Sequence, residues 1–289
     1  MSSLQQSYAE CEHVAKTQAR NFYYSFLTLP PDKKAAMCAI YAFFRYSDDV
    51  SDEAAENGDK AGKMRAWRSA LDRAMQGDYG DSKILPAFHD TVKKYGIPQN
   101  YFYELIDGTE MDLTKNRYAT FEELYRYCYL VASLVGFVCI YVWGFEKDNP
   151  LSIKHAESCG LAFQLTNILR DVKEDAERDR VYLPQEDLDK FGVTIDQLKA
   201  GQPTDNVRAL IMFEVDRAVA YYAEAEKLVP LLHAHGRPSY GIMNKIYRGI
   251  LDDIVNKNYD VFTSRARVST PRKLAILSGA WLSSRFTKA

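Results

Sequence analysis

The chain has 289 residues, of which 47% are hydrophobic and 26% charged, a composition typical of globular proteins and unlike disordered or fibrous ones. Its 37 basic and 39 acidic residues nearly balance, which argues against general nucleic-acid binding. The five cysteines form no CxxC pair, and the N-terminus does not resemble a signal peptide. We therefore expect a reducing, cytoplasmic setting.

Apolar residues recur with a helical period along almost the whole chain. The N-terminus reads as the start of a helix, and a second helix is predicted to begin at Pro31 and continue through Glu53. Further helices are predicted over Lys60–Gln76, Ser82–Tyr95, Gln99–Leu113, Thr120–Phe145, Leu151–Arg178, Asn206–Leu232 and Ile242–Asn258, and from Pro271 towards the C-terminus. The segments between them are short. The sequence predicts one all-α domain over residues 1–289, with its helices packed around a shared core.

One segment, Tyr129–Phe145, carries no charge and bears on membrane association. A spanning helix needs roughly 20 apolar residues, and a shorter run is more often a buried helix. Glu146 and Lys147 follow it at once. We expect this segment to be a core helix, with Gly136 at a close helix contact or in a pocket wall.

Two acidic pairs stand out. Asp48 and Asp52 lie four residues apart after the apolar stretch "AIYAFF", and Asp171 and Asp175 repeat the spacing after "LAFQLTNIL". Residues four apart share a helix face, where like charges destabilise an isolated helix by roughly 0.2–0.5 kcal/mol. A solvated helix end would explain one such pair, but the repetition favours a site.

The chemistry that suits two such pairs is magnesium-assisted loss of diphosphate. Mg²⁺ binds through a few carboxylates and takes further ligands from substrate phosphates. The 20 tyrosines and 14 phenylalanines could supply an aromatic chamber for the resulting carbocation. Gln164 and Asn167 extend the second pair into a polar stripe. Arg45 and Arg180, each next to an acidic motif, are suited to the diphosphate.

At these residues the sequence resembles the squalene/phytoene synthase family. The matches are "AIYAFFRYSDDVSDE" and "QLTNILRDVKEDAERDRVYLP", supported by "NFYYSFLTLP", "ELIDGTEMDL", "YCYLVASLVG" and the late "KIYRGILDDI" and "RARVSTPRKL". The resemblance implies a single all-α bundle of the isoprenoid synthase type around a central cavity. It also implies head-to-head joining of two prenyl diphosphates, through a cyclopropyl intermediate that some members rearrange to a C30 or C40 hydrocarbon.

The resemblance assigns roles residue by residue. Asp48, Asp52, Asp171 and Asp175 would hold two or three Mg²⁺ ions, with Asn167 as a further ligand. Contacts to substrate or diphosphate would come from Phe22, Tyr41, Arg45, Tyr129, Gln164, Asn167, Arg170, Arg180, Tyr182, Tyr247 and Arg265, with Tyr129 and Gly136 lining the cavity. Tyr247 would stabilise the cationic intermediate or assist the second step, completing a catalytic set with Arg45 and the four acids. Asn21 stands directly before Phe22, at a position where many family members carry a serine.

Within the family, the segments "FYYSFLTLP" and "STPRKL" most resemble those of bacterial presqualene diphosphate synthases of hopanoid pathways. This predicts condensation of two farnesyl diphosphates to presqualene diphosphate, with onward conversion to squalene or dehydrosqualene left open. The alternative is a phytoene synthase acting on geranylgeranyl diphosphate. NADPH use and the choice between monomer and homodimer also stay open. Because the prenyl chains of the substrates are hydrophobic, we expect the protein to make weak peripheral contact with a membrane.

Two other readings are disfavoured. A head-to-tail prenyl elongase would share the first motif, but the second runs from Asp171 to Asp175 without a doubled aspartate at its start. A non-catalytic assembly factor related to this family would have lost the acids, and all four are present.

Overall fold

The computed structural model describes residues 3–19, 21–57 and 60–286. The side chains of residues 21, 51–57, 60 and 281–286 lie outside this description. Among the described residues there are two isolated β-bridges and no strand. The all-α prediction is confirmed.

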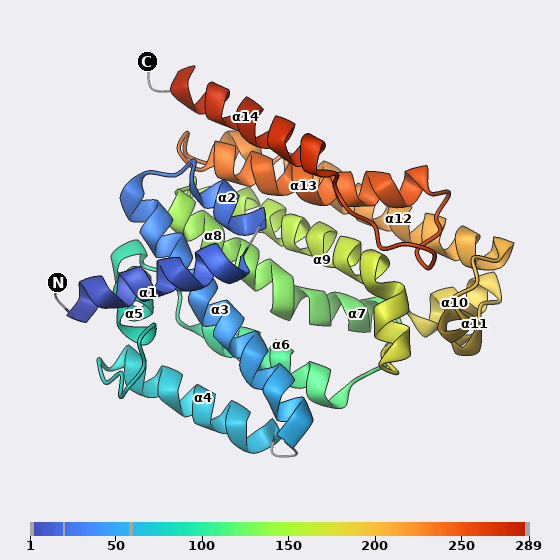
Figure 1. Cartoon of the computed structure of the whole chain (residues 1–289), viewed down its shortest axis with the longest axis horizontal. Coiled ribbons are helices and arrows are strands. Elements are labelled where there is room, and N and C mark those ends of the chain that lie inside the picture. Colours follow the sequence, from blue (N-terminus) through green and yellow to red (C-terminus); the bar gives the residue numbers. More distant parts are fainter. Residues whose placement is uncertain (1–2, 20, 58–59, 287–289) are drawn as a thin grey trace.

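The helices follow one another through short connections (Figure 1). They are α1 (Ser3–Gln18), α2 (Asn21–Phe26), α3 (Pro31–Asn57), α4 (Lys60–Met75), α5 (Leu85–Tyr95), α6 (Asn100–Thr114), α7 (Phe121–Cys128), α8 (Leu134–Trp143), α9 (Leu151–Glu177), α10 (Gln185–Phe191), α11 (Ile195–Ala200), α12 (Asp205–Glu226), α13 (Arg237–Asn256) and α14 (Thr270–Phe286). A π-helical turn, Tyr129–Ser133, joins α7 to α8, and a short 3₁₀ turn, Val229–Leu231, follows α12.

Local chemistry explains most helix ends. Pro31 opens α3, as expected for a residue without a backbone N–H. The Ser82 hydroxyl accepts the Leu85 N–H at 3.2 Å, so Ser82 precedes α5 rather than starting it as predicted. Gly96 ends α5 in the left-handed conformation that glycine adopts without strain. The helix expected to reach Leu232 ends at Glu226, because Pro230 cannot continue it.

The apolar segment from Phe121 to Trp143 is long enough and apolar enough to cross a membrane, but 61% of its most apolar window is buried inside the bundle. It is also not one straight helix, because the π turn interrupts it. Backbone packing accompanies the interruption: a Cβ on Gly160 of α9 would lie 2.4 Å from the Ser133 Cα. The prediction of a core helix is supported, and helical structure covers Phe121–Trp143 of the predicted range Thr120–Phe145, with a π turn within it that was not expected.

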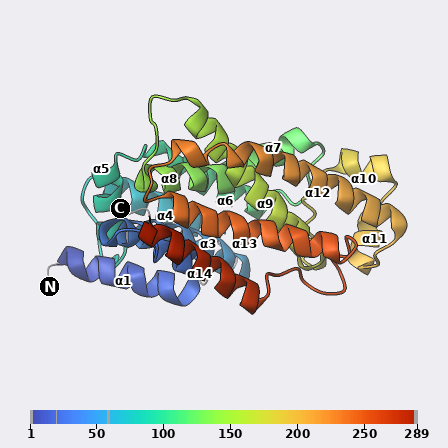
Figure 2. The same cartoon turned by 90° about the horizontal axis from the view of Figure 1, so that it is seen from above.

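Two clusters of buried side chains form the core. One fills the space between α1, α3, α5, α6 and α8, where Phe43 stacks on Phe88 with ring centroids 4.1 Å apart. The other lies between α7, α9, α12 and α13. Helix α14 lies along the outside of α13 (Figures 1 and 2). The five cysteines are all buried and unpaired.

Candidate active site

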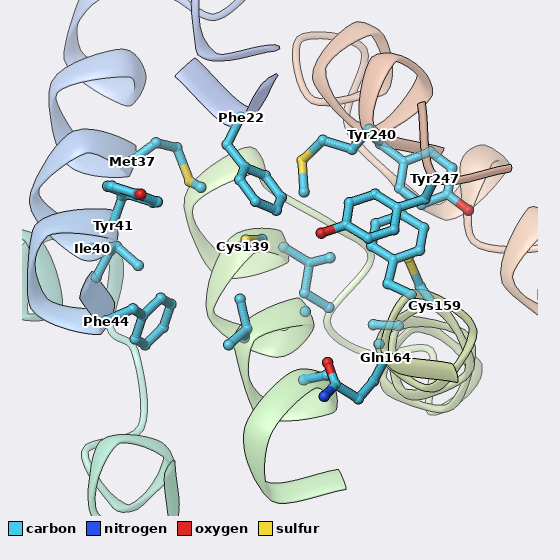
Figure 3. Close-up of a pocket in the computed structure, with 18 of the residues that line it drawn as sticks. Phe22, Met37, Ile40, Tyr41, Phe44, Cys139, Cys159, Gln164, Tyr240 and Tyr247 are labelled. Carbon is cyan, nitrogen blue, oxygen red and sulfur yellow. The ribbon is translucent and has the colours of Figure 1, made fainter. Parts of the chain in front are cut away.

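A cavity of about 280 Å³ lies between α2, α3, α8, α9 and α13 (Figure 3). Three of its walls are helix faces. On α3 the lining runs from Met37 to Asp48, and on α9 from Ala156 to Asn167. Each stretch covers twelve residues, and its first and last residues lie about 16 Å apart along the helix axis. Asp48, Gln164 and Asn167 supply the polar groups at one end. The opposite end is apolar. The cavity therefore has a polar end, here called the mouth, and a hydrophobic interior.

Aromatic rings line the middle of this cavity. Tyr247 of α13 stacks on Phe163 of α9 with centroids 4.3 Å apart and planes 4° apart. Phe22 of α2 lies 5.9 Å from Tyr247 and 6.5 Å from Tyr41 of α3. Burial raises the pKa of both tyrosine hydroxyls, so they stay neutral near neutral pH. Ring faces of this kind attract a cation by roughly 0.5–2 kcal/mol each.

The first acidic motif lies at the mouth. Asp48 lines the cavity, whereas Asp49, on another face of α3, pairs with Arg45. The Nε atom of Arg45 is buried and finds no acceptor among the described residues. A buried guanidinium N–H without a partner is unfavourable, and a phosphate oxygen would satisfy it. Asp52 belongs to α3, but its side chain lies outside the described residues, and so does that of Asn21.

The second acidic motif is held by arginines. Arg170 donates to both carboxylate oxygens of Asp171, from Nε at 2.8 Å and from Nη2 at 2.5 Å. Arg265, from the link between α13 and α14, donates to the same carboxylate from Nε at 2.8 Å. Arg265 also approaches Glu174 at 3.7 Å. The carboxylate of Asp171 is therefore organised by the protein before any ligand arrives.

Asp175, one turn further along α9, has a different electrostatic setting. Burial, helped by the charge of Asp171, raises the pKa of its carboxyl from 3.8 to about 6, although Arg180 and Arg178 oppose the shift. A carboxylate that is held ionised against desolvation gains from a nearby cation. A divalent cation bound here would favour the ionised form of this carboxyl.

Asn167 connects the motif to the cavity. Its Nδ2 donates to the side-chain Oε1 of Gln164 at 3.3 Å, and its buried Oδ1 finds no donor among the described residues. A buried amide oxygen without a hydrogen-bond donor is unfavourable unless a cation binds it. The position of Asn167 one turn before Asp171 favours cation binding.

The donors at the mouth fit a hard cation. Asp48, Asp171, Asp175 and Asn167 offer only oxygen atoms, which Mg²⁺ prefers over nitrogen or sulfur. Within the part of the chain that the structure describes, no three acidic, histidine or cysteine groups form a ready-made metal site. That agrees with ions that complete their coordination with water and a diphosphate rather than in an all-protein cage.

Arg180 and Tyr182 do not line the main cavity. Both line a small hollow beside Asp175. The Tyr182 hydroxyl donates to one oxygen of Asp112 at 2.8 Å, and the Tyr127 hydroxyl donates to the other at 2.7 Å. Arg180 donates to the Asp112 carbonyl at 3.2 Å. Direct substrate contact by these two residues stays a prediction, and the structure gives them a supporting position behind the second motif.

The other predicted residues divide between the cavity and its surroundings. Gly136 lines the cavity, but Tyr129 lies outside its lining, where its ring packs against Phe137 and under the Arg126 guanidinium. Sequence reasoning missed Asp112 and Phe163. The position of Phe163, four residues before Asn167, could have revealed it, because the two share one helix face. Asp112 gave no comparable signal, since its partners come from distant segments.

Comparisons with known proteins agree with this architecture. The family model described as squalene/phytoene synthase matches residues 15–272. The chain is 39% identical to the 15-cis-phytoene synthase of Synechococcus elongatus, over 98% of this chain and 94% of that one. It is 36% identical to the chloroplastic phytoene synthase 2 of Solanum lycopersicum, over 96% and 91% of the two chains.

Solved structures resemble it as well. A crystal structure of a dehydrosqualene synthase superposes with a TM-score of 0.87 at 28% identity, covering 99% of this chain and 98% of that one. The squalene synthase HpnC from Alicyclobacillus acidocaldarius gives a TM-score of 0.82 at 28% identity, covering 89% and 96%.

These findings correct the sequence-based preference within the family. We expected a presqualene diphosphate synthase that uses farnesyl diphosphate, and that expectation is wrong. The curated relatives with 36–39% identity over nearly the whole chain are phytoene synthases, whereas the squalene-type structures are 28% identical. The alternative named from the sequence is the better supported one.

Proposed function

The chain belongs to the squalene/phytoene synthase family, a family of prenyltransferases, and from this premise we propose that it acts as a phytoene synthase. It joins two molecules of geranylgeranyl diphosphate head to head and releases both diphosphates. The observation that carries the proposal is the near-full-length identity to phytoene synthases of cyanobacteria and plants.

The cavity supports this chemistry in its layout. Its polar end carries Asp48, Gln164 and Asn167, with Asp171 one helical turn beyond Asn167 and outside the lining, and its long walls are apolar and aromatic, as two prenyl chains require. Asp48, Asp52, Asn167, Asp171 and Asp175 would hold magnesium, which would neutralise the diphosphate leaving group. Arg45, with its unsatisfied Nε, and Arg265 are suited to bind the diphosphate oxygens.

After diphosphate leaves, the chain's own residues shelter the cation. Phe22, Phe163 and Tyr247 surround the middle of the cavity with ring faces, and burial keeps the Tyr247 hydroxyl neutral. Excluding water from this chamber protects the cation from capture as an alcohol. The relatives' product has a double bond at the new central junction, and forming it requires loss of protons rather than addition of hydride. We therefore propose that no NADPH is needed.

A product assay tests the proposal. Purified protein with Mg²⁺ is incubated with geranylgeranyl diphosphate or with farnesyl diphosphate, each with and without NADPH, and the extracted lipids are identified by mass spectrometry. We expect a C40 hydrocarbon from the longer substrate, unchanged by NADPH and absent in EDTA. A C30 product as the dominant outcome would overturn the substrate assignment, and no released diphosphate from either substrate would overturn the enzymatic one.

The same preparation addresses the remaining expectations. We propose a cytoplasmic protein with weak peripheral membrane contact, because both substrate and product partition into lipid. Sedimentation with liposomes, with and without substrate, measures that contact. Light scattering decides between a monomer and a homodimer.

A further inference from the structure

The end of the cavity opposite the acids is closed by Trp143, the last residue of α8. Cys139, Ile140 and Trp143 all line the cavity, and their spacing places them on one helix face. Tyr240 of α13 meets the Trp143 ring edge to face, with centroids 6.4 Å apart and planes at 77°. Only 3% of Trp143 is exposed. The indole is therefore the last large group that a prenyl chain entering from the mouth would meet along α8.

The backbone beneath this ring is fixed on several sides. Lys33, at the start of α3, donates from Nζ to the Trp143 carbonyl at 2.6 Å. The His233 N–H donates to the Gly144 carbonyl at 2.9 Å, which ties the end of α8 to the connection between α12 and α13. Gly144 has φ of 89°, and a Cβ there would lie 2.4 Å from the His233 ring. The end of α8 has little freedom to move away from a longer ligand.

The connection between α12 and α13 also packs closely against the base of the Trp143 side chain. A Cβ built on Gly236 would lie 2.6 Å from the Trp143 Cβ, so the backbone of the α12–α13 connection presses directly on this residue. Close-packed interiors respond to added volume by strain rather than by yielding smoothly. The base of the Trp143 side chain is therefore held in place at this end of the cavity.

Hydrogen bonding does not explain why this residue is a tryptophan. The Trp143 Nε1 is buried and has no acceptor among the described residues, which is unfavourable for a donor. Trp67 of α4, which is also buried, donates from Nε1 to the Ser47 hydroxyl at 2.9 Å. What Trp143 contributes is the size and shape of its ring at the end of the cavity.

We propose that Trp143 is a specificity-determining residue that sets the longest prenyl chain the enzyme accepts. The inference rests on the proposed function, because it assumes that prenyl chains occupy this cavity. Removing the ring lengthens the space available to the tail, and adding bulk one turn nearer the mouth shortens it.

The test compares kcat/KM for C15, C20 and C25 all-trans prenyl diphosphates, with products identified by mass spectrometry. In Trp143→Leu we expect the ratio of C25 to C20 to rise tenfold or more. Trp143→Phe, a smaller change, should move the ratio in the same direction by a smaller factor. A rise below threefold in a folded, active Trp143→Leu or Trp143→Phe protein overturns the proposal.

A variant with the opposite effect separates specificity from damage. Cys139 lies one turn before Trp143 on the same cavity-lining face. Cys139→Leu should lower the C20 to C15 ratio fivefold or more, and an unchanged ratio contradicts the proposal. General loss of structure would not move the two ratios in opposite directions. If Trp143→Leu does not fold, Trp143→Phe takes its place in this comparison with Cys139→Leu.

The matched control is Trp67→Leu, which removes the same group from a buried site outside the cavity. It should leave both ratios within twofold of the unmutated enzyme, and a change like that of Trp143→Leu would refute a local role. Failure of the proposed function looks different. There the unmutated enzyme fails to convert C20 to C40, whereas failure of this inference leaves that conversion intact and the ratios unmoved.

Discussion

Helices α3 and α9 are both 27 residues long, and each carries an acidic motif towards its C-terminal end. They differ in how their charge is balanced. On α9, Asp171 is held by Arg170 from its own helix and by Arg265, 94 residues away in sequence, and only 19% of its side chain is exposed. On α3, an ion pair joins Arg45 to Asp49, with 39% and 37% of the side chains exposed.

The difference shows that similar sequence motifs can be in different electrostatic states. The second motif is organised by the protein's own cations, and a ligand there must compete with or recruit them. The first motif offers Asp48 to the cavity and keeps a buried Arg45 N–H unsatisfied, so it is arranged to receive an anion. The following variants test that contrast, starting with the largest expected effect.

Asp48→Asn and Asp171→Asn should each lower diphosphate release about 10³-fold, because either change removes a carboxylate needed to neutralise the leaving group. Release is measured with saturating geranylgeranyl diphosphate and Mg²⁺, and folding is checked by circular dichroism. Asp252→Asn, which alters an exposed ion-paired acid on α13, is the control and should stay within twofold. Full activity in either motif variant would contradict the metal assignment.

Asp175→Asn should inactivate the enzyme but stabilise the metal-free protein. The carboxyl has a pKa of about 6 in the folded state against an ordinary value of 3.8. Unfolding therefore releases a proton between these values, and folding stability falls as pH rises from about 4 to 6. The gain from asparagine should reach about 3 kcal/mol at pH 7.5 and vanish near pH 4.

Urea unfolding in EDTA at the two pH values measures this gain. An equal gain in stability at pH 7.5 and near pH 4 would show that the gain does not come from removing a buried charge. Asp179→Asn is the control with the opposite sign, because Lys199 and Arg117 lower the pKa of the Asp179 carboxyl. That variant should lose stability at pH 7.5 and match the unmutated protein at low pH.

Arg265→Gln should raise KM for the prenyl diphosphate about tenfold and leave kcat within threefold. The expected change corresponds to about 1.4 kcal/mol, the scale of one charge-assisted contact formed equally in the ground and transition states. Initial rates at varied substrate measure it. The neighbouring Arg267→Gln should have little effect on KM. An equal KM effect in both variants would point to general charge attraction instead of a specific role for Arg265.

Asp49→Asn should change the free energy of unfolding by less than about 1 kcal/mol, since its pair with Arg45 is exposed. Denaturation in low salt and in 1 M salt measures the effect, which should shrink as salt rises. Asp171→Asn, which leaves two arginines without their carboxylate, should destabilise by about 1–3 kcal/mol. If Asp49→Asn destabilised the protein more than Asp171→Asn, the electrostatic contrast between the two motifs would be wrong.

The sequence predicted the long helices because each contains several turns of apolar period. It missed α2, α10 and α11, which have 6 or 7 residues and are too short to display that period. The π turn at Tyr129–Ser133 had no local signal, since it goes with the close approach of Gly160 from α9.

The site residues also fall into those that local spacing predicts and those that depend on distant segments. The four-residue spacing of Asp171 and Asp175 predicted that they share one helix face, because helix geometry alone sets that relation, and their role as magnesium ligands stays a prediction. The pairing of Arg265 with Asp171, the tyrosines on Asp112 and the closure by Trp143 depend on residues far apart in sequence. Chain-length preference belongs to this second group, which is why sequence reasoning favoured the wrong substrate.

The burial of all five cysteines has a practical consequence for labelling. Desolvation raises the pKa of each thiol, to about 12 for Cys11, Cys38 and Cys139, so the reactive thiolate is scarce at neutral pH. A cysteine introduced on an exposed position, such as Leu274 of α14, would be the reactive one without deleting the others. Fluorescent or spin labels placed this way could follow substrate binding in an otherwise unmodified chain.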